Sequence, residues 1–188
     1  MQVWATIFRI TGQTYGGRMI EKGKLEAAKK HAEKNPAEKE RLLLNRLRNS
    51  CARREYSRAD VLKKALTVLE DSSAAERVAD SLVKDGFVSD SRYAAAYARE
   101  KASISGWGKI KIRHTLRAKG LSSEDIEMGL REVDDESAAS KLRKVVGVKF
   151  ASLKDDPQRH VKLLRFAMGR GYSYEEVESE IRRCEAGR

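Results

Sequence analysis

The sequence contains few cysteines, prolines and aromatic residues, and it lacks a long hydrophobic run. Its two cysteines, Cys51 and Cys184, each continue an apolar helical stripe, which favours small buried side chains over a disulfide or a reactive thiol. Its two prolines, Pro36 and Pro157, are too few to interrupt the periodic segments, which favours an all-helical fold. No apolar run could span a bilayer and no secretory signal opens the chain, so we expect a cytoplasmic, soluble protein with no membrane partner.

Recognisable catalytic and metal-binding motifs are also missing. The segment 17–24 approximates a phosphate-binding loop, but five residues separate its glycines where four are needed, and Leu25 replaces the required Ser or Thr. The three histidines are scattered, without cysteine or carboxylate at metal-ligand spacing. The acidic run 134–136 is better explained as an exposed linker and helix start. We therefore expect no enzyme activity, no catalytic residue, no cofactor and no metal site.

Positive charge is abundant by contrast. The chain has 39 Lys and Arg against 28 Asp and Glu, a formal net charge of +11, which favours a polyanion or an acidic protein surface as partner. Residues 92–119 contain eight basic residues and one acidic residue, whereas residues 120–140 contain seven acidic and one basic. Acidic first turns of helices explain part of this contrast. A basic face that recurs along an elongated array explains it better.

The segment 86–130 is predicted to form a unit of three helices. Ser89 and Asp90 are candidate caps for the first helix. The sequence Gly-Trp-Gly at 106–108 separates the first helix from the second, and Gly120 is expected to end the second in the left-handed conformation. The third helix begins with a predicted capping box of Ser122 and Asp125. Its apolar residues share one helical face: Ile126, Gly129, Leu130 and Val133.

This unit recurs at a period of about 50 residues. The sequence Gly-Leu-Ser at 120–122 aligns with Gly-Tyr-Ser at 171–173, a spacing of 51, and Ile112 then aligns with Leu163. Upstream, Leu66 precedes Leu116 by 50, and Val78 and Leu82 precede their counterparts in the third helix by 48. Three similar helical units indicate a tandem repeat in which each unit contacts mainly its neighbours.

The flanking units are assigned in the same way. In the first, Ser57 with Asp60 caps the second helix. In the last, Asp156 and Pro157 are predicted to be the N-cap and first residue of the second helix, and Ser173 with Glu176 forms a capping box. The predicted apolar faces are listed by helix: Leu43, Leu44 and Leu47; Leu62, Ala65, Leu66 and Leu69; Ala75, Val78, Ala79 and Leu82; Ile112 and Leu116; Val145, Val146 and Phe150; Val161, Leu164 and Met168; Val177, Ile181 and Cys184.

The predicted fold is therefore all-α, with three tandem three-helix repeats forming an elongated, curved right-handed-type array. We place the first repeat at residues 37–87, the second at 88–133 and the third at 134–188. Residues 1–36 are predicted to be an N-terminal extension, either poorly ordered or docked as a strand or helix.

Several sequence landmarks, in this order along the chain, resemble those of the RecX family of bacterial regulators of the RecA recombinase. They are ARREYS at 52–57, GF at 86–87 with DSRY at 90–93, GWG at 106–108, LRAKG at 116–120 and RGY at 170–172. The similarity extends from about Leu42 to Cys184. It implies a regulator of DNA repair and the SOS response that lies in the groove of a RecA–single-stranded-DNA filament. There it would inhibit strand exchange, ATP hydrolysis and repressor cleavage. The basic faces predict in addition weaker, salt-sensitive binding to free single- and double-stranded DNA, and we expect a monomer.

Ten basic residues are candidates for contact with RecA or DNA: Arg53, Arg54, Arg92, Arg99, Lys109, Arg113, Arg117, Lys119, Arg165 and Arg170. Seven residues are predicted to shape the repeat motif: Tyr56, Ser57, Trp107, Gly108, Gly120, Gly171 and Ser173. Tyr56 and Trp107 each precede a second helix and either pack on its first turn or offer a platform on which bases stack.

Two other functions are compatible with the sequence. A helix, a glycine-containing turn and a capped helix resemble a helix-turn-helix module that binds DNA independently of RecA, although the acidic third helices count against this interpretation. Charge and repetition alone also allow a structural adaptor for another acidic protein.

Overall fold

The computed structural model describes residues 35–187, and within this range the chain is helical, with no strand. The predicted extension therefore lies outside the described residues, apart from Asn35, which caps the first described helix, and Pro36, which begins it. The helices are α2 (Pro36–Cys51), α3 (Arg58–Leu69), α4 (Ser72–Lys84), α5 (Asp90–Ser103), α6 (Lys109–Ala118), α7 (Ser123–Arg131), α8 (Asp135–Ser152), α9 (Arg159–Met168) and α10 (Tyr174–Ala186).

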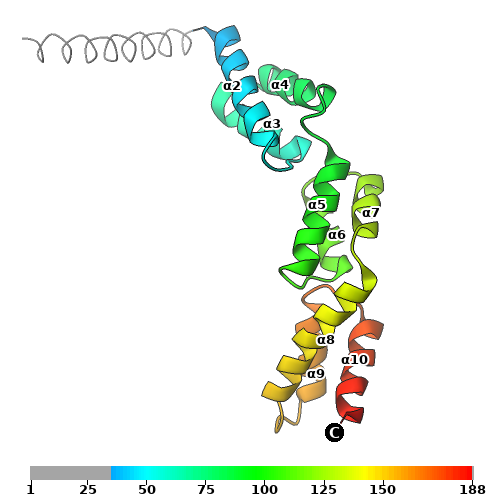
Figure 1. Ribbon diagram of the computed structural model, residues 1–188. Helices are drawn as coiled ribbons and strands as arrows, with labels where there is room; N and C mark the ends of the chain where they lie inside the picture. Colours follow the sequence, from blue (N-terminus) through cyan, green and yellow to red (C-terminus); the bar gives the residue numbers. More distant parts are fainter. Residues whose placement is uncertain (1–34, 188) are drawn as a thin grey trace, which may run out of the picture.

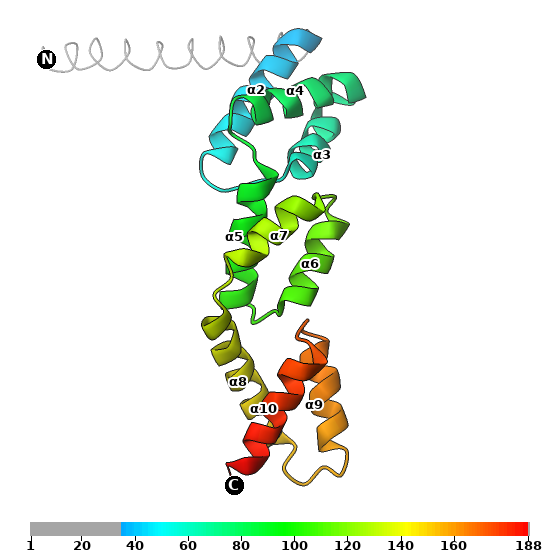
Figure 2. The ribbon, with the colours of Figure 1, turned by 90° about the vertical axis from the view of Figure 1, so that its right-hand side faces the viewer.

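These helices form three groups that follow one another along an elongated, curved rod (Figures 1 and 2). Helices α2–α4 lie at one end, α5–α7 in the middle and α8–α10 at the other end. The all-α fold of three tandem three-helix repeats is thereby confirmed. The boundaries assigned to the repeats stay a prediction.

Each repeat has its own hydrophobic core. Three separate clusters of buried residues occur in the described part of the chain, one per helix group. Every first helix buries the positions i, i+4 and i+8 of one face: Leu43, Leu47 and Cys51 in α2; Ala94, Ala98 and Ala102 in α5; Leu142, Val146 and Phe150 in α8. The repeat of this pattern shows that the three units bury equivalent faces against their neighbouring helices.

In the middle repeat, α5 and α7 pack closely against each other. Its first helix buries three alanines, and a Cβ on Gly129 of α7 would lie 2.6 Å from the carbonyl carbon of Ala94 in α5. Small side chains on both helices let the two backbones approach each other. All four apolar residues predicted for α7 are buried, as are the four predicted for α4, but α7 ends at Arg131 and Val133 follows it.

The faces predicted for the second helices were partly wrong. The equivalent buried residues are Val61, Ile112 and Leu163, followed by Ala65, Leu116 and Ala167, and all six are inaccessible to solvent. Each of these series has a constant spacing of 51, so the period of 50 that placed Leu66 opposite Leu116 was one residue short. Leu66, Val161 and Met168 are exposed instead. Helices α3 and α9 carry apolar residues on several sides. A choice of the face with the larger apolar side chains therefore included residues that are exposed.

The N-caps were largely predicted correctly. Ser57, Ser89, Ser122 and Ser173 all cap helices, and their side chains accept a backbone N–H from the first turn. Gly120 has the predicted left-handed backbone, with φ at 84°. Ser173 and Glu176 form a complete capping box, whereas Asp125 does not return a bond to the backbone of Ser122. Its carboxylate accepts the hydroxyl groups of Ser91 and Ser122 and so ties α7 to α5.

The start of α9 differs from the prediction. This helix begins at Arg159 with Gln158 as its N-cap, and Pro157 lies in the preceding turn. Asp156 caps that turn, because its carboxylate accepts the N–H of Gln158 at 2.9 Å and its carbonyl accepts the N–H of Arg159. Both cysteines are free: Cys51 is buried in the first core and Cys184 is partly buried against the third.

Candidate functional site

The second and third repeats meet through their backbones. The N–H of Gly108, the N-cap of α6, donates to the carbonyl of Arg170 at 2.9 Å, and the N–H of Ile110 donates to Gly171 at 3.1 Å. The turn after α9 thus satisfies donors that the first turn of a helix leaves free. A Cβ on Gly108 would lie 2.1 Å from the carbonyl oxygen of Gly171, so the close approach requires glycine.

The junction between the first and second repeats is built differently. Gly120 occupies the position equivalent to Gly171, but no atom lies within 4 Å of the place its Cβ would take. Side chains bridge this junction instead. Asp90 accepts the N–H of Arg58 at 2.7 Å, and the ammonium group of Lys119 lies 3.2 Å from a carboxylate oxygen of Asp60. The two backbones stay apart, and an open groove remains between the repeats.

This groove has a volume of about 600 Å³. It lies between α3 and the preceding loop on one side and α5 with the end of α6 on the other. Its lining combines tyrosines, basic residues and carboxylates: Arg54, Glu55, Tyr56, Asp60, Lys63, Lys64, Thr67, Tyr93, Ala96, Tyr97, Glu100, Lys101 and Lys119. It therefore offers both aromatic surface and positive charge to a ligand.

The aromatic rings of the groove are covered by cations. The rings of Tyr93 and Tyr97 stack with centroids 5.9 Å apart. Lys119 lies 5.5 Å from the Tyr93 ring and Lys101 lies 5.2 Å from the Tyr97 ring. On the opposite wall, Arg54 lies 4.4 Å above the ring of Tyr56. These cation–π contacts hold positive charge next to flat apolar surfaces.

The carboxylates of the groove are already neutralised. Glu55 pairs with Arg92 at 2.9 Å, Asp60 with Lys119 and Glu100 with Lys101 at 2.7 Å. Burial alone would raise the pKa of Asp60, but hydrogen bonds from Lys119 and Ser57 outweigh it and hold this pKa below its ordinary value.

The charge left without a carboxylate is positive. Within residues 35–187, Lys63, Lys64 and Arg54 form no ion pair, and all three are exposed. Lys64 lies 5.2 Å from the Tyr56 ring. These three cations give the groove its positive field, because the other basic groups of its lining are already paired.

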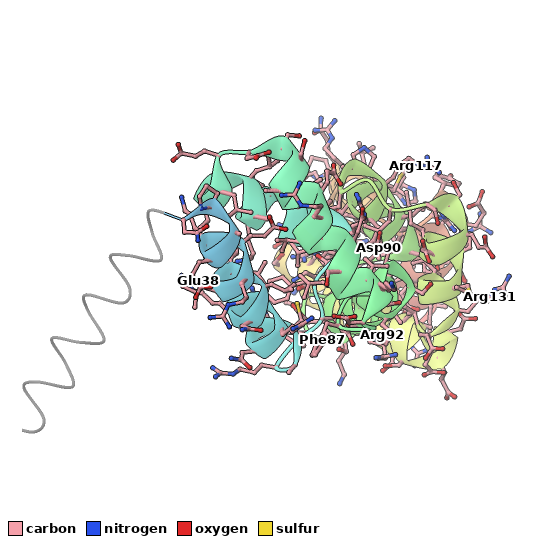
Figure 3. All side chains as sticks on the ribbon, turned by 90° about the horizontal axis from the view of Figure 1, so that it is seen from above. Glu38, Phe87, Asp90, Arg92, Arg117 and Arg131 are labelled. Atoms are coloured by element: carbon pink, nitrogen blue, oxygen red, sulfur yellow. The ribbon has the colours of Figure 1, made fainter. Side chains whose placement is uncertain are left out.

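The structure brings only some of the predicted contact residues together. Arg54 and Lys119 line the groove with Tyr56, while the others are distributed along the rod. Seen from above, Arg92 and Arg117 lie on different sides of the molecule (Figure 3). These two predicted contact residues therefore do not share one face of the middle repeat.

Several predicted contact residues are engaged within the protein. Lys109 pairs with Asp135 at 2.5 Å, and Arg113 binds Glu127 through two hydrogen bonds of 2.7 and 3.0 Å. The basic stripe on α6 therefore faces the acidic residues of α7 and the start of α8. Arg92 pairs with Glu55 and also donates to the Gly86 carbonyl, and Arg99 pairs with Glu132. The guanidinium group of Arg170 lies over the Phe166 ring. Arg53, Arg117 and Arg165 are exposed without an ion pair in the described part of the chain.

Tyr56 and Trp107 occupy equivalent positions in different surroundings. Trp107 is partly buried against the second core, and the ammonium group of Lys111 lies 4.4 Å from its ring. Tyr56 packs partly against the first core but also lines the open groove. These surroundings support a packing role for Trp107. For Tyr56 they are compatible with packing and with a platform on which bases stack.

Five residues that line the groove were not predicted as candidates for binding: Lys63, Lys64, Tyr93, Tyr97 and Lys101. The spacing of these residues in the sequence could have identified them. The two tyrosines are four residues apart and so share a helical face, and Lys63 and Lys64 lie between the buried positions Val61 and Ala65. Nothing in the sequence places α3 opposite α5.

Residues 35–187 contain no group of His, Cys, Asp and Glu side chains that could hold a metal ion. No helix in the same range has both the length and the apolar character needed to cross a membrane.

Three similar units, three cores and two unlike junctions define a helical repeat protein of three-helix modules. Residues 89–130 match the family model described as RecX, second three-helix domain. The regulatory protein RecX of Pseudomonas entomophila (strain L48) is 32% identical over 127 residues, covering 67% of this chain and 81% of that protein. The regulatory protein RecX of Clostridium tetani (strain Massachusetts / E88) is 32% identical over 125 residues, covering 64% of this chain and 57% of that protein. The crystal structure of RecX from Lactobacillus salivarius has the same fold, with a TM-score of 0.70 at 18% identity, covering 80% of this chain and 99% of that one.

The chain belongs to the RecX family of regulatory proteins. The resemblance noted in the sequence is thereby confirmed.

Proposed function

We propose that this protein regulates the RecA recombinase by lying in the groove of the RecA–single-stranded-DNA filament, where it inhibits strand exchange, ATP hydrolysis and repressor cleavage. Membership of the RecX family supports a regulatory role, and we expect it to act on DNA repair and the SOS response in the cytoplasm. The protein is proposed to act as a monomer, without catalytic chemistry of its own.

The observation that carries this proposal is the shape of the molecule. Three modules follow one another along a rod (Figure 2), and each has its own core. Such an array can contact more than one protomer of a helical polymer, and linked contacts strengthen each other through effective concentration. The net charge of +11 favours an anionic partner and predicts that binding weakens as salt increases.

The test is an assay of DNA-dependent ATP hydrolysis by RecA. Stoichiometric amounts of this protein are expected to lower the rate and to co-sediment with RecA filaments formed on single-stranded DNA. An unrelated basic protein of similar size serves as the control for charge. Unchanged ATP hydrolysis together with unchanged filament length would contradict the proposal.

The helix-turn-helix alternative predicts base-specific DNA binding in the absence of RecA. The acidic first turn of α7, with Glu124 and Asp125, argues against insertion of this helix into a DNA groove. Arg113 of α6 also forms an ion pair with Glu127 of α7 and so is not free to read bases. A filter-binding assay across salt concentrations separates the two functions.

A further inference from the structure

The groove between the first and second repeats has no function in the account given above. We propose that it binds a short stretch of single-stranded nucleic acid, with bases against Tyr56 and Tyr97 and phosphates on Lys63 and Lys64. This inference depends on the proposed function only for its biological setting, the DNA strand of a RecA filament. The site itself follows from the contents of the groove.

The aromatic lining favours bases over other anionic ligands. The walls carry Tyr56 on one side and the stacked pair Tyr93 and Tyr97 on the other, and all three rings border the same cavity. Bases stack on tyrosine rings with little regard to sequence, because every base has a flat π surface. To stack here they displace the flexible side chains of Arg54 and Lys101, which lie over the rings of Tyr56 and Tyr97. A peptide made of acidic residues has no aromatic ring, and it would use only the charge of this groove.

The charged residues are placed for a phosphate backbone. Lys63 and Lys64 are adjacent on α3, exposed and without an ion pair among the described residues, while the carboxylates of the groove are paired. The Oε2 atom of Glu55 is buried and lacks a hydrogen-bond partner in the described part of the chain. A base that enters beside Glu55 can donate a ring N–H, as thymine does, or an amino hydrogen to this oxygen.

The dimensions also distinguish single strands from duplex DNA. A cavity of about 600 Å³ is in the range of small-ligand sites. It holds a few unstacked bases, whereas the bases of a duplex are already stacked on each other and are inaccessible to the tyrosines. The open junction at Gly120 creates this space, and the equivalent space at the second junction is filled by the contact between Gly108 and Gly171.

Fluorescence anisotropy of the full chain with a labelled strand of about twelve deoxythymidines tests this site without RecA. Replacement Tyr97→Leu, which keeps apolar bulk, is expected to weaken binding about tenfold, and Tyr97→Phe is expected to retain it. The double reversal Lys63→Glu and Lys64→Glu is expected to weaken binding by a similar factor and to reduce the salt dependence.

The matched control is the double reversal Lys84→Glu and Lys144→Glu. It makes the same change in net charge at two exposed helical lysines that do not line the groove. Affinity that falls for the groove variants and changes less than about threefold in the control supports the site. The site would be overturned by equal losses of affinity in both double variants or by unchanged binding of Tyr97→Leu. It would also be overturned if a glutamate-rich peptide competed as effectively as the unlabelled strand.

The proposed function can be judged separately. Inhibition of RecA by the wild-type chain without any effect of Tyr97→Leu on oligonucleotide binding would reject this site and leave the regulatory role intact. Oligonucleotide binding that depends on Tyr97, without any effect of the wild-type chain on RecA, would support this site and reject the regulatory role. Far-UV circular dichroism of each variant verifies that the repeats remain folded.

Discussion

Gly120 and Gly171 show how the same residue in the same conformation can have different roles. Both end a helical turn with positive φ, 84° and 90°. The site of a Cβ on Gly120 is open, whereas a Cβ on Gly171 would lie 2.3 Å from the Cβ of Lys111 and 2.4 Å from its backbone nitrogen. Gly120 is therefore required for its backbone conformation alone, and Gly171 is also required for the approach of the neighbouring repeat.

Alanine substitutions separate these two requirements. Gly120→Ala is expected to lower the free energy of unfolding by about 1 kcal/mol, through the strain of a left-handed backbone. Gly171→Ala is expected to lower it by about 3 kcal/mol, because the clash with Lys111 adds the cost of overpacking. Urea unfolding followed by circular dichroism measures both.

Gly86→Ala is the matched control, since its φ is 74° and its Cβ site is also open. It should resemble Gly120→Ala. Equal effects of all three substitutions would show that the second junction does not depend on the contact between backbones.

At the scale of the helix, α9 shows the limit of hydrophobic patterns. Its ten residues include Val161, Leu163, Leu164, Phe166 and Met168, so apolar residues occur on nearly every side. Leu163 is inaccessible to solvent, whereas Val161 is 54% exposed. The alignment of repeats, which places Leu163 opposite Ile112, identified the buried residue correctly where the pattern within the helix did not.

This correction predicts unequal effects of two neighbouring substitutions. Leu163→Ala is expected to destabilise the protein by about 3 kcal/mol, through lost burial and the cavity that remains. Val161→Ala should change stability by less than about 0.5 kcal/mol, as is usual at the surface. Thermal unfolding followed by circular dichroism distinguishes them, and a larger effect at Val161 would restore the face predicted from the sequence.

At the scale of the whole molecule, the distribution of charge matters more than its amount. The basic stripe of α6 faces acidic residues of its own chain, and Lys109 and Arg113 are held in ion pairs there. Arg117 belongs to the same stripe but is exposed and forms no ion pair among the described residues. Charge reversal at the three positions therefore has two kinds of consequence, internal repulsion and loss of external contact.

The single substitution Arg117→Glu isolates the external contact. We expect it to weaken co-sedimentation with RecA filaments about threefold at low salt and less at high salt, because exposed charges are screened. The triple reversal of Lys109, Arg113 and Arg117 is expected to weaken association further while helicity is retained. Lys84→Glu provides a control for net charge, and an equal effect of this control would exclude a specific role for Arg117.

The sequence by itself determined the repeat, the helices and most of their ends. Capping serines, Gly120 and the faces of α4 and α7 were predictable, because capping and helical periodicity depend on residues within a few positions of each other. The family resemblance was also present in the landmarks from Ala52 to Tyr172.

Only the tertiary structure decided how neighbouring repeats meet and which charges remain free. Gly108 and Gly171, which meet at the second junction, are more than 50 positions apart in the sequence. Gly120 makes no such contact at the first junction, and the groove remains open there. The pairing of Lys119 with Asp60 spans 59 positions. Such distances are set by the packing of whole modules, and the local pattern of a sequence carries no measure of them.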